Sequence, residues 1–228
     1  MSKRTWIILG VVAVLLIGGG VAYKMMSGGG DALSASAAGG NLPPDQVHPD
    51  DKTMGDAHAP VTMVEYFAQD CSVCAAFDQA VFPQLKAKYI DTGKVYYVMR
   101  LFPLFPLDGQ AYKLDLCVPP EHFFQAVDLL FRNQPQWDSA EYQGVDANAG
   151  LHKMARILGM TDEQADKCMN DTSQDAHINK VAEDGNTRYT IQGTPTFAID
   201  FKKANFQNNS WDEVQKALDA ALAAKGVK

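Results

Sequence analysis

The sequence predicts an α/β domain in which a βαβ unit and a closing ββα unit flank a long helical insertion. Three observations support this fold class. An apolar run at 61–68 leads into Cys71-Ser72-Val73-Cys74, and residues 75–89 repeat apolar side chains at helical spacing. A second apolar run covers 95–101, and Gly193-Thr194-Pro195-Thr196-Phe197 precedes another strand-like run. Strands that alternate with helical patterns are typical of βαβ units.

The first 24 residues predict a membrane anchor or an export signal. Lys3 and Arg4 precede an uncharged stretch at 6–23, which would be roughly 27 Å long as a helix. This length lies between that of a signal-peptide apolar region and that of a full span of about 20 residues. We favour an anchor over a cleaved signal. The basic residues would stay inside and the bulk of the chain would face an oxidising, periplasmic or other extracytoplasmic compartment, tethered to the inner membrane.

Residues 25–52 predict a flexible tether, because they are dominated by Gly, Ser, Ala, Asp and Pro and show no apolar period. As a coil, such a segment would reach roughly 30 Å. The folded domain is expected at 53–226. Its first half should consist of a strand at 61–68, a helix at 72–89 that Pro83 kinks, and a strand at 95–101.

The helical insertion is expected at 109–189, where apolar residues recur at helical spacing. After the proline loop, the sequence predicts a strand at 196–201 and a short edge strand at 204–206. A last helix should run from Ser210 to about Ala224, since Ser210 and Glu213 have the spacing of a capping box.

Composition excludes some classes of function. Apolar residues make up 46% of the chain, which suffices for one sizeable core. The formal net charge is -7, and the first 24 residues carry only basic charges, so the rest is more acidic still and nucleic acid is not expected as a partner. The five histidines are scattered without metal-ligand spacing, so we expect no metal site.

The four cysteines divide into two pairs, as expected for an exported protein. Cys71 and Cys74 form one pair. Their setting before a helix favours a redox dithiol over a structural disulfide or half of a zinc site. Cys117 and Cys168 form the other pair, which we interpret as a structural disulfide, with a second redox relay as the alternative.

The order of these motifs, over 53–226, resembles the bacterial DsbA-like family of thioredoxin-fold protein-disulfide oxidoreductases. The segments that carry the likeness are 55–62, Cys71-Ser72-Val73-Cys74, 89–95, Phe102-Pro103-Leu104 and 193–197. The resemblance implies a thioredoxin fold with a helical insertion between the βαβ half and a ββα half that begins at a cis-proline. It also implies disulfide exchange with unfolded or reduced exported proteins, no cofactor beyond the redox-active disulfide, and a membrane partner that resets the dithiol.

Position by position, the resemblance makes Cys71 the exposed nucleophile, Cys74 its buried resolving partner and Pro195 the cis-proline that faces them. Thr194 would offer backbone hydrogen bonds to the substrate, which Ser72 and Val73, between the cysteines, would also contact. Glu65 matches the buried acid that moves the proton of the inner cysteine. The alternative for Glu65 is an ordinary surface carboxylate, although the apolar strand around it argues for burial.

The cysteine roles also have a physical basis. A sulfur at a helix N-terminus faces unpaired amides and the positive end of the helix dipole, which favour the thiolate. Strong oxidants of the family usually have Pro-His between the cysteines, whereas this chain has Ser72 and Val73. We therefore expect a milder oxidant. The alternatives are a disulfide reductase or isomerase of the same fold and a redox-inert client-binding or metal-chaperone module.

The apolar segment 102–107 follows the second strand and has two interpretations. It would either pack into the core beneath the helical insertion, which we favour slightly, or line a groove for an unfolded client protein.

Overall fold

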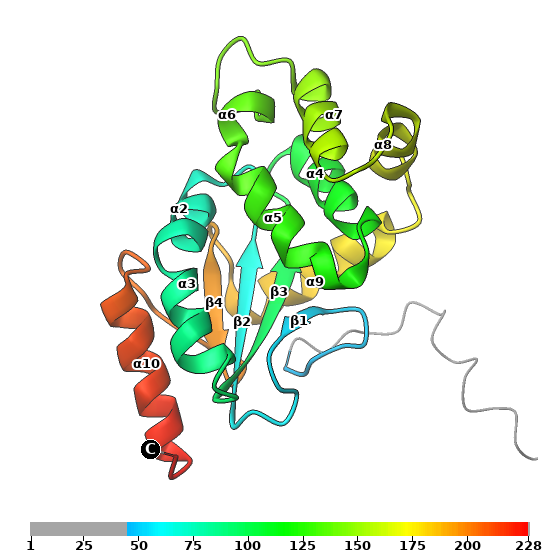
Figure 1. Ribbon diagram of the computed structural model, residues 1–228. Coiled ribbons are helices and arrows are strands. Elements are labelled where there is room, and N and C mark those ends of the chain that lie inside the picture. The colour runs from blue at the N-terminus through cyan, green and yellow to red at the C-terminus, as the bar shows by residue number, and fades with distance from the viewer. Residues whose placement is uncertain (1–44, 228) are drawn as a thin grey trace, which may run out of the picture. The chain divides into compact units, whose positions relative to one another are not determined.

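The computed structural model describes residues 45–227, and the predicted anchor at 1–24 and most of the predicted tether lie outside them. Within the described part, every helix is too short or too polar to span a bilayer. A five-stranded mixed sheet forms its centre, in the order β1-β3-β2-β4-β5, and helices lie on both faces (Figure 1). The predicted α/β class with a helical insertion is confirmed.

The central strands are β2 (Val61–Phe67) and β3 (Val95–Leu101), which run parallel and pair Glu65 with Met99. Both are buried along almost their whole length. Strands covered by helices on both faces lose the usual alternation of apolar and polar residues, which explains why 61–67 and 95–101 read as nearly continuous apolar runs. The remaining pairs, β1 with β3, β2 with β4 and β4 with β5, are antiparallel.

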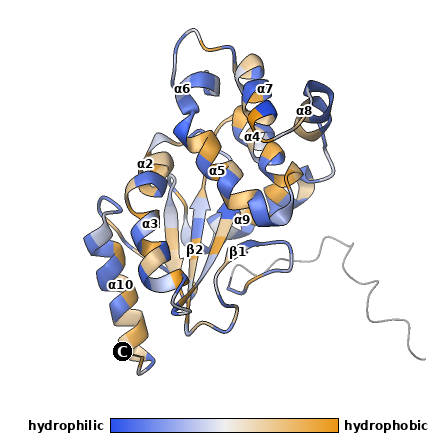
Figure 2. Cartoon of the chain, in the orientation of Figure 1, coloured by the Kyte–Doolittle hydropathy of each residue, from blue (hydrophilic) through white to orange (hydrophobic). Residues whose placement is uncertain are grey.

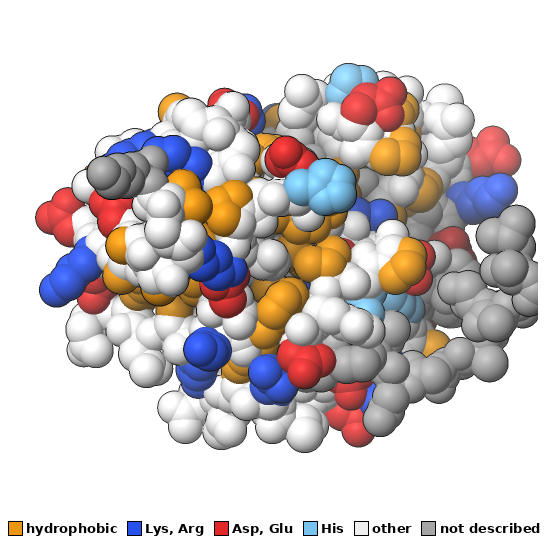
Figure 3. Space-filling model, turned by 90° about the horizontal axis from the view of Figure 1, so that it is seen from below, with side chains coloured by type: hydrophobic (Ala, Val, Ile, Leu, Met, Phe, Trp, Pro, Cys, Tyr) orange, Lys and Arg blue, Asp and Glu red, His pale blue; other side chains and the backbone are white. Residues whose placement is uncertain are grey.

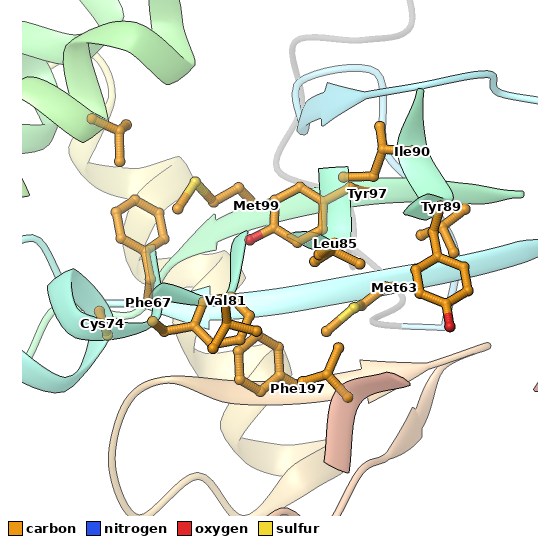
Figure 4. Packing of buried hydrophobic residues seen from close by; sticks show 14 of the residues in the cluster. Met63, Phe67, Cys74, Val81, Leu85, Tyr89, Ile90, Tyr97, Met99 and Phe197 are labelled. Atoms are coloured by element: carbon orange, nitrogen blue, oxygen red, sulfur yellow. The ribbon is translucent and has the colours of Figure 1, made fainter. Parts of the chain in front are cut away.

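One face of the sheet packs against the helices that follow the dithiol. Figure 4 shows part of this apolar cluster, with Met63 and Phe67 from β2, Tyr97 from β3 and Phe197 from β4. Cys74 lies at one end of the cluster. The opposite face packs against α9 (Asp175–Tyr189), where Gly185 is required, because a Cβ atom there would lie 2.4 Å from the ring of Tyr66.

The helix predicted at 72–89 is broken into three pieces. These are α2 (Ser72–Ala80), α3 (Phe82–Leu85) and the π-helical turn η1 (Lys86–Ile90). The expected effect of Pro83 is thus larger than a kink, since it lies in the first turn of the new helix α3. That position suits proline, whose missing amide has no partner in a first turn.

The helical insertion begins three residues earlier than predicted, with α4 (Pro106–Cys117). It continues through η2 (Pro120–His122), α5 (Phe123–Arg132), α6 (Gln134–Trp137), α7 (Ala147–Ile157) and α8 (Asp162–Met169) to α9. Apolar and polar residues occur together along these helices in Figure 2, as expected for helices with one buried face. Helices α4, α5, α7 and α8 share a second apolar cluster around Trp137.

The closing half follows the prediction except at its hairpin. Strand β4 (Thr196–Ile199) ends before Asp200 and Phe201, which have positive φ values of 45° and 59° and form the turn. Its partner β5 is Lys202–Lys203 rather than 204–206. Helix α10 (Trp211–Ala224) begins after Ser210, and the predicted capping box with Glu213 is present.

The folded domain begins earlier than the predicted boundary at residue 53. Strand β1 (Lys52–Met54) pairs with β3, and Asp51 before it forms a buried salt bridge with Arg100, 2.7 Å long. Arg100 also donates a hydrogen bond to the carbonyl of Gln46. His48 is 7% exposed. The composition of the residues before 53 suggested a tether. A single buried ion pair could not correct this prediction, because it does not produce a regular spacing of apolar residues.

The surface does not concentrate charge of one sign on the face that Figure 3 presents, where lysine, arginine and acidic side chains are interspersed.

Candidate active site

Cys71 is the residue that precedes α2, and it caps the helix with its own side chain. Its backbone is extended, with φ −76° and ψ 111°, and its Sγ accepts a hydrogen bond from the amide of Cys74 at 3.1 Å. The sulfur therefore occupies the position where a helix N-terminus stabilises negative charge. Cys71 is partly exposed and Cys74 is fully buried, and both are free thiols.

The two sulfurs differ strongly in acidity. Hydrogen bonds, above all the one with the side chain of Cys74, lower the pKa of Cys71 to about 6, and partial burial opposes them. Burial raises the pKa of Cys74 well above its ordinary value, and the neighbouring Cys71 raises it further. Near neutral pH the arrangement therefore supports an accessible thiolate at Cys71 beside a buried thiol at Cys74, which suits attack by the outer sulfur.

The proline loop lies against the outer cysteine. The Thr194–Pro195 peptide bond is cis, and the thiol of Cys71 donates a hydrogen bond to the carbonyl of Thr194 at 3.3 Å. The hydroxyl of Thr196 bonds the carbonyl of Gly193 at 2.7 Å and closes the loop on itself. Segments more than 120 residues apart in the sequence thus meet at one sulfur.

Glu65 is buried, with 1% of its surface exposed, and the phenol of Tyr97 donates a hydrogen bond to it. It shares the sheet face of Met63 and Phe67, the face that α2 covers. Burial raises the pKa of Glu65 to about 8. A carboxyl group that is mostly protonated near neutral pH can give a proton to a buried sulfur and take it back.

Three carboxyl and amide side chains that the sequence did not single out hold the chain just before Cys71. Asp108 accepts a hydrogen bond from the amide of Asp70 at 2.9 Å, and Gln134 donates one to the carbonyl of Gln69 at 3.0 Å. Gln69 in turn bonds the carbonyl of Val127 at 3.4 Å. The helical insertion therefore fixes the backbone on the approach to the dithiol.

Sequence signals for these residues were weak. Pro106 followed by an acid two residues later is typical of a helix start, and could have identified Asp108 as a capping residue. Nothing in the sequence indicates that its carboxylate also reaches Asp70. Tyr97 lies in a predicted strand, but its contact with Glu65 depends on the register between β2 and β3, which sequence patterns do not provide.

The segment 102–107 is not simply part of the core, contrary to the interpretation that we favoured. Leu104 and Phe105 are 42% and 50% exposed, while Phe102 and Leu107 are partly buried against the apolar clusters. The amides of Leu104 and Phe105 donate to Asp108, at 2.8 and 2.9 Å, and the same carboxylate binds Asp70. The exposed apolar pair therefore lies close to the dithiol.

Cys117 at the end of α4 and Cys168 in α8 form a disulfide, with their Cα atoms 6.2 Å apart. It connects two helices of the insertion. Within the described residues no group of three or more His, Cys, Asp or Glu side chains is arranged to hold a metal ion.

Comparison with known proteins agrees with this geometry. The thioredoxin family model matches residues 48–220. A Rickettsia prowazekii protein, provisionally named a protein-disulfide oxidoreductase, is 31% identical over 183 residues, which cover 78% of this chain and 63% of the relative. This chain thus spans less than two thirds of that relative. A Bacillus cereus protein provisionally named disulfide bond formation protein D is 27% identical and is covered over 99% of its length, with 97% of this chain.

Among solved structures, Wolbachia pipientis α-DsbA1 matches with a TM-score of 0.69 and 26% identity, over 80% of this chain and 97% of that one. The family model, the sequence relatives and this structure agree with one another: the chain belongs to the thioredoxin family and, within it, to the DsbA-like proteins.

Proposed function

We propose that this chain is an extracytoplasmic thiol-disulfide oxidoreductase that introduces or exchanges disulfides in exported proteins through Cys71 and Cys74. The observation that carries the proposal is the contrast between the two sulfurs, with one capping α2 at the surface and the other buried behind it. A structural disulfide or a zinc site needs no such difference in acidity. The names of the relatives point to the same activity.

The mechanism begins, in the oxidising direction, with the disulfide form of the pair. A client thiolate attacks the Sγ of Cys71, the bond between Cys71 and Cys74 breaks, and the sulfur of Cys74 leaves with the electron pair. The protonated Glu65 supplies a proton for Cys74, whose high pKa favours the thiol. A second client thiolate then attacks the client sulfur of the mixed disulfide, and Cys71 leaves as a stabilised thiolate.

We propose oxidation as the main direction, since a low pKa at Cys71 stabilises the reduced form and leaves the disulfide a good oxidant. Val73 is 52% exposed, and its apolar side chain cannot donate a hydrogen bond to the sulfur. The pair should therefore be a milder oxidant than relatives with a histidine there. Reduction or isomerisation, in which the Cys71 thiolate attacks a client disulfide and Cys74 releases it, is the second candidate.

Clients of this enzyme would be unfolded or reduced chains. The exposed Val73, Leu104 and Phe105 support this proposal, because unfolded segments offer apolar side chains to such a surface. A membrane redox protein would reset the dithiol. Residues 6–23 would tether the domain to the inner membrane, in keeping with the uncharged stretch in the sequence.

The test is trapping of a reduced, unfolded client by single-cysteine variants. Cys74→Ser should accumulate a mixed disulfide through Cys71, because it retains the nucleophile and lacks the resolving thiol. Cys71→Ser should neither trap the client nor catalyse exchange. Trapping through Cys74 in the Cys71→Ser variant would reverse the assigned roles, and catalysis by both variants at the rate of the parent would refute the proposed activity.

A further inference from the structure

Three buried carboxyl groups converge beside the start of the dithiol helix, and the mechanism above uses none of them. Asp70 directly precedes Cys71 and is 5% exposed. Asp108 from the first turn of α4 and Asp138 at the end of α6 are both 0% exposed. Each comes from a different segment. The contact that joins the first two is the hydrogen bond from the Asp70 amide to the Asp108 carboxylate.

Hydrogen-bond donors are distributed unequally among the three. Asp108 accepts from the amides of Asp70, Leu104 and Phe105. Asp138 accepts from two amides, those of Ala140 and Glu141, at 2.9 and 3.3 Å. Both carboxylate oxygens of Asp70 are buried and have no hydrogen-bond donor within the described residues. Because hydrogen-bond donors stabilise the charged form of a carboxyl group, nothing of that kind in the described part of the chain favours an ionised Asp70.

Positive charge does not compensate the cluster. None of the salt bridges formed within residues 45–227 includes any of the three carboxyl groups, and the buried Arg100 and Lys113 pair instead with Asp51 and Asp175. Cys71 and Glu141 also act on the cluster, and both add negative charge when ionised. Buried like charges cannot all ionise, so at least one proton should stay in the cluster.

Asp70 is the group that should hold this proton. Burial raises its pKa to about 9, and Asp108, Asp138 and Cys71 act in the same direction. The last of these contributions depends on the redox state, because Cys71 is negatively charged as a thiolate and neutral in a disulfide. Asp70 must therefore bind its proton more tightly in the reduced protein than in the oxidised protein.

We propose that Asp70 is a positioning residue whose buried carboxyl group binds its proton more tightly once the Cys71–Cys74 disulfide is reduced, so that molecules in which Asp70 is ionised take up a proton that offsets the charge of the new thiolate. This inference rests on the proposed function. If Asp70 does not change its protonation, reduction of the disulfide consumes two electrons and one proton and yields the Cys71 thiolate and the Cys74 thiol. With Asp70 ionised beforehand, reduction consumes two electrons and two protons, and the second proton binds the Asp70 carboxylate. Where Asp70 is ionised in the oxidised protein, the reduction potential then rises more steeply with acidity than uptake of one proton would give.

The number of protons taken up follows from the pH dependence of the reduction potential, measured on the full chain between about pH 7.5 and pH 9. Each proton changes the equilibrium constant for reduction tenfold per pH unit. Glu65 also titrates in this range, so Glu65→Gln is the parent for the comparison. We expect this parent to take up more than one proton, and Asp70→Asn in the same background to take up one.

The matched control is Asp115→Asn in the same background. Asp115 in α4 is likewise 0% exposed with both oxygens lacking a partner among the described residues, but burial alone raises its pKa. We expect this variant to retain the proton uptake of the parent. An uptake of one proton in the parent, or an uptake unchanged by Asp70→Asn, would overturn the proposal. Equal loss in the Asp115→Asn control would also overturn it, because the effect would not be specific to Asp70.

Infrared difference spectra provide a second measurement that does not depend on an Asp70 variant. Reduction of the Glu65→Gln protein near pH 8.5 should produce a carboxylic-acid carbonyl band at the expense of a carboxylate band. Absence of this band would overturn the proposal even if Asp70→Asn failed to fold. The outcomes also separate the two proposals: if Cys71 and Cys74 had no measurable potential, the proposed function would fail, whereas a potential coupled to one proton would overturn only the role of Asp70.

Discussion

Replacing Cys117 and Cys168 with alanine should lower stability by about 4 kcal/mol and leave exchange chemistry largely intact. The disulfide joins residues separated by 51 positions. In the chain-entropy model, closing a loop of this length removes about 14 cal/mol/K from the unfolded chain, which corresponds to about 4 kcal/mol at 25 °C. For a domain of this size, 1 kcal/mol corresponds to roughly 2 to 4 °C in Tm, so we expect Tm to fall by about 10 °C.

The assay is differential scanning calorimetry of parent and double variant, both with Cys71→Ser and Cys74→Ser so that only the second pair can be oxidised. Exchange activity is measured separately in proteins that retain the catalytic pair. Cys117 is exposed and Cys168 is partly exposed, so alanine should leave no large cavity to complicate the result. An unchanged Tm together with lost activity would refute the structural reading and favour a redox relay.

Two further predictions concern the dithiol and its buried acid. Val73→His should lower the pKa of Cys71 and raise the reduction potential. Since position 73 is half exposed, we expect about half to one pKa unit, or roughly 15 to 30 mV, in a glutathione titration, and an equal or lower potential would remove the argument for a milder native oxidant. Glu65→Gln should gain stability relative to the parent as pH rises. The pKa of Glu65 is raised from 4.5 to about 8 on folding, so the parent loses stability between these values, by roughly 4 kcal/mol in all. Urea unfolding at pH 4.5 and pH 9 measures the difference, and parallel curves for the two proteins would show that Glu65 is not protonated in the folded state.

Elements with strong local signals were predictable from the sequence. The two central strands agree with their predicted ranges to within one residue, because strands covered by helices on both faces have almost continuously apolar sequences. The last helix also begins where its capping box predicts. The observed boundaries differ from the predicted ones where a single contact or backbone conformation determines the structure. Asp51 extends the domain by its ion pair with Arg100, and the positive φ angles of Asp200 and Phe201 move the hairpin.

Within the site, sequence motifs located Cys71, Cys74 and Pro195, because each sits in a short recognisable pattern. Glu65 could be named only through the family resemblance and the apolar run around it. Asp70 and Asp108 were missed. Their relation depends on a contact between segments 38 residues apart, and no periodicity or motif records a hydrogen bond of that kind.

The proposed chemistry requires Cys71 to be a stabilised thiolate and Cys74 to be a thiol. The ultraviolet absorbance of the thiolate, followed in the reduced protein as a function of pH, tests it most directly. We predict a transition near pH 6, since hydrogen bonds at the start of α2 lower the pKa of Cys71 to about 6, and we predict that Cys71→Ser removes this transition. A midpoint near the ordinary cysteine value of about 8.5, or a transition near pH 6 that persists in Cys71→Ser, would contradict it.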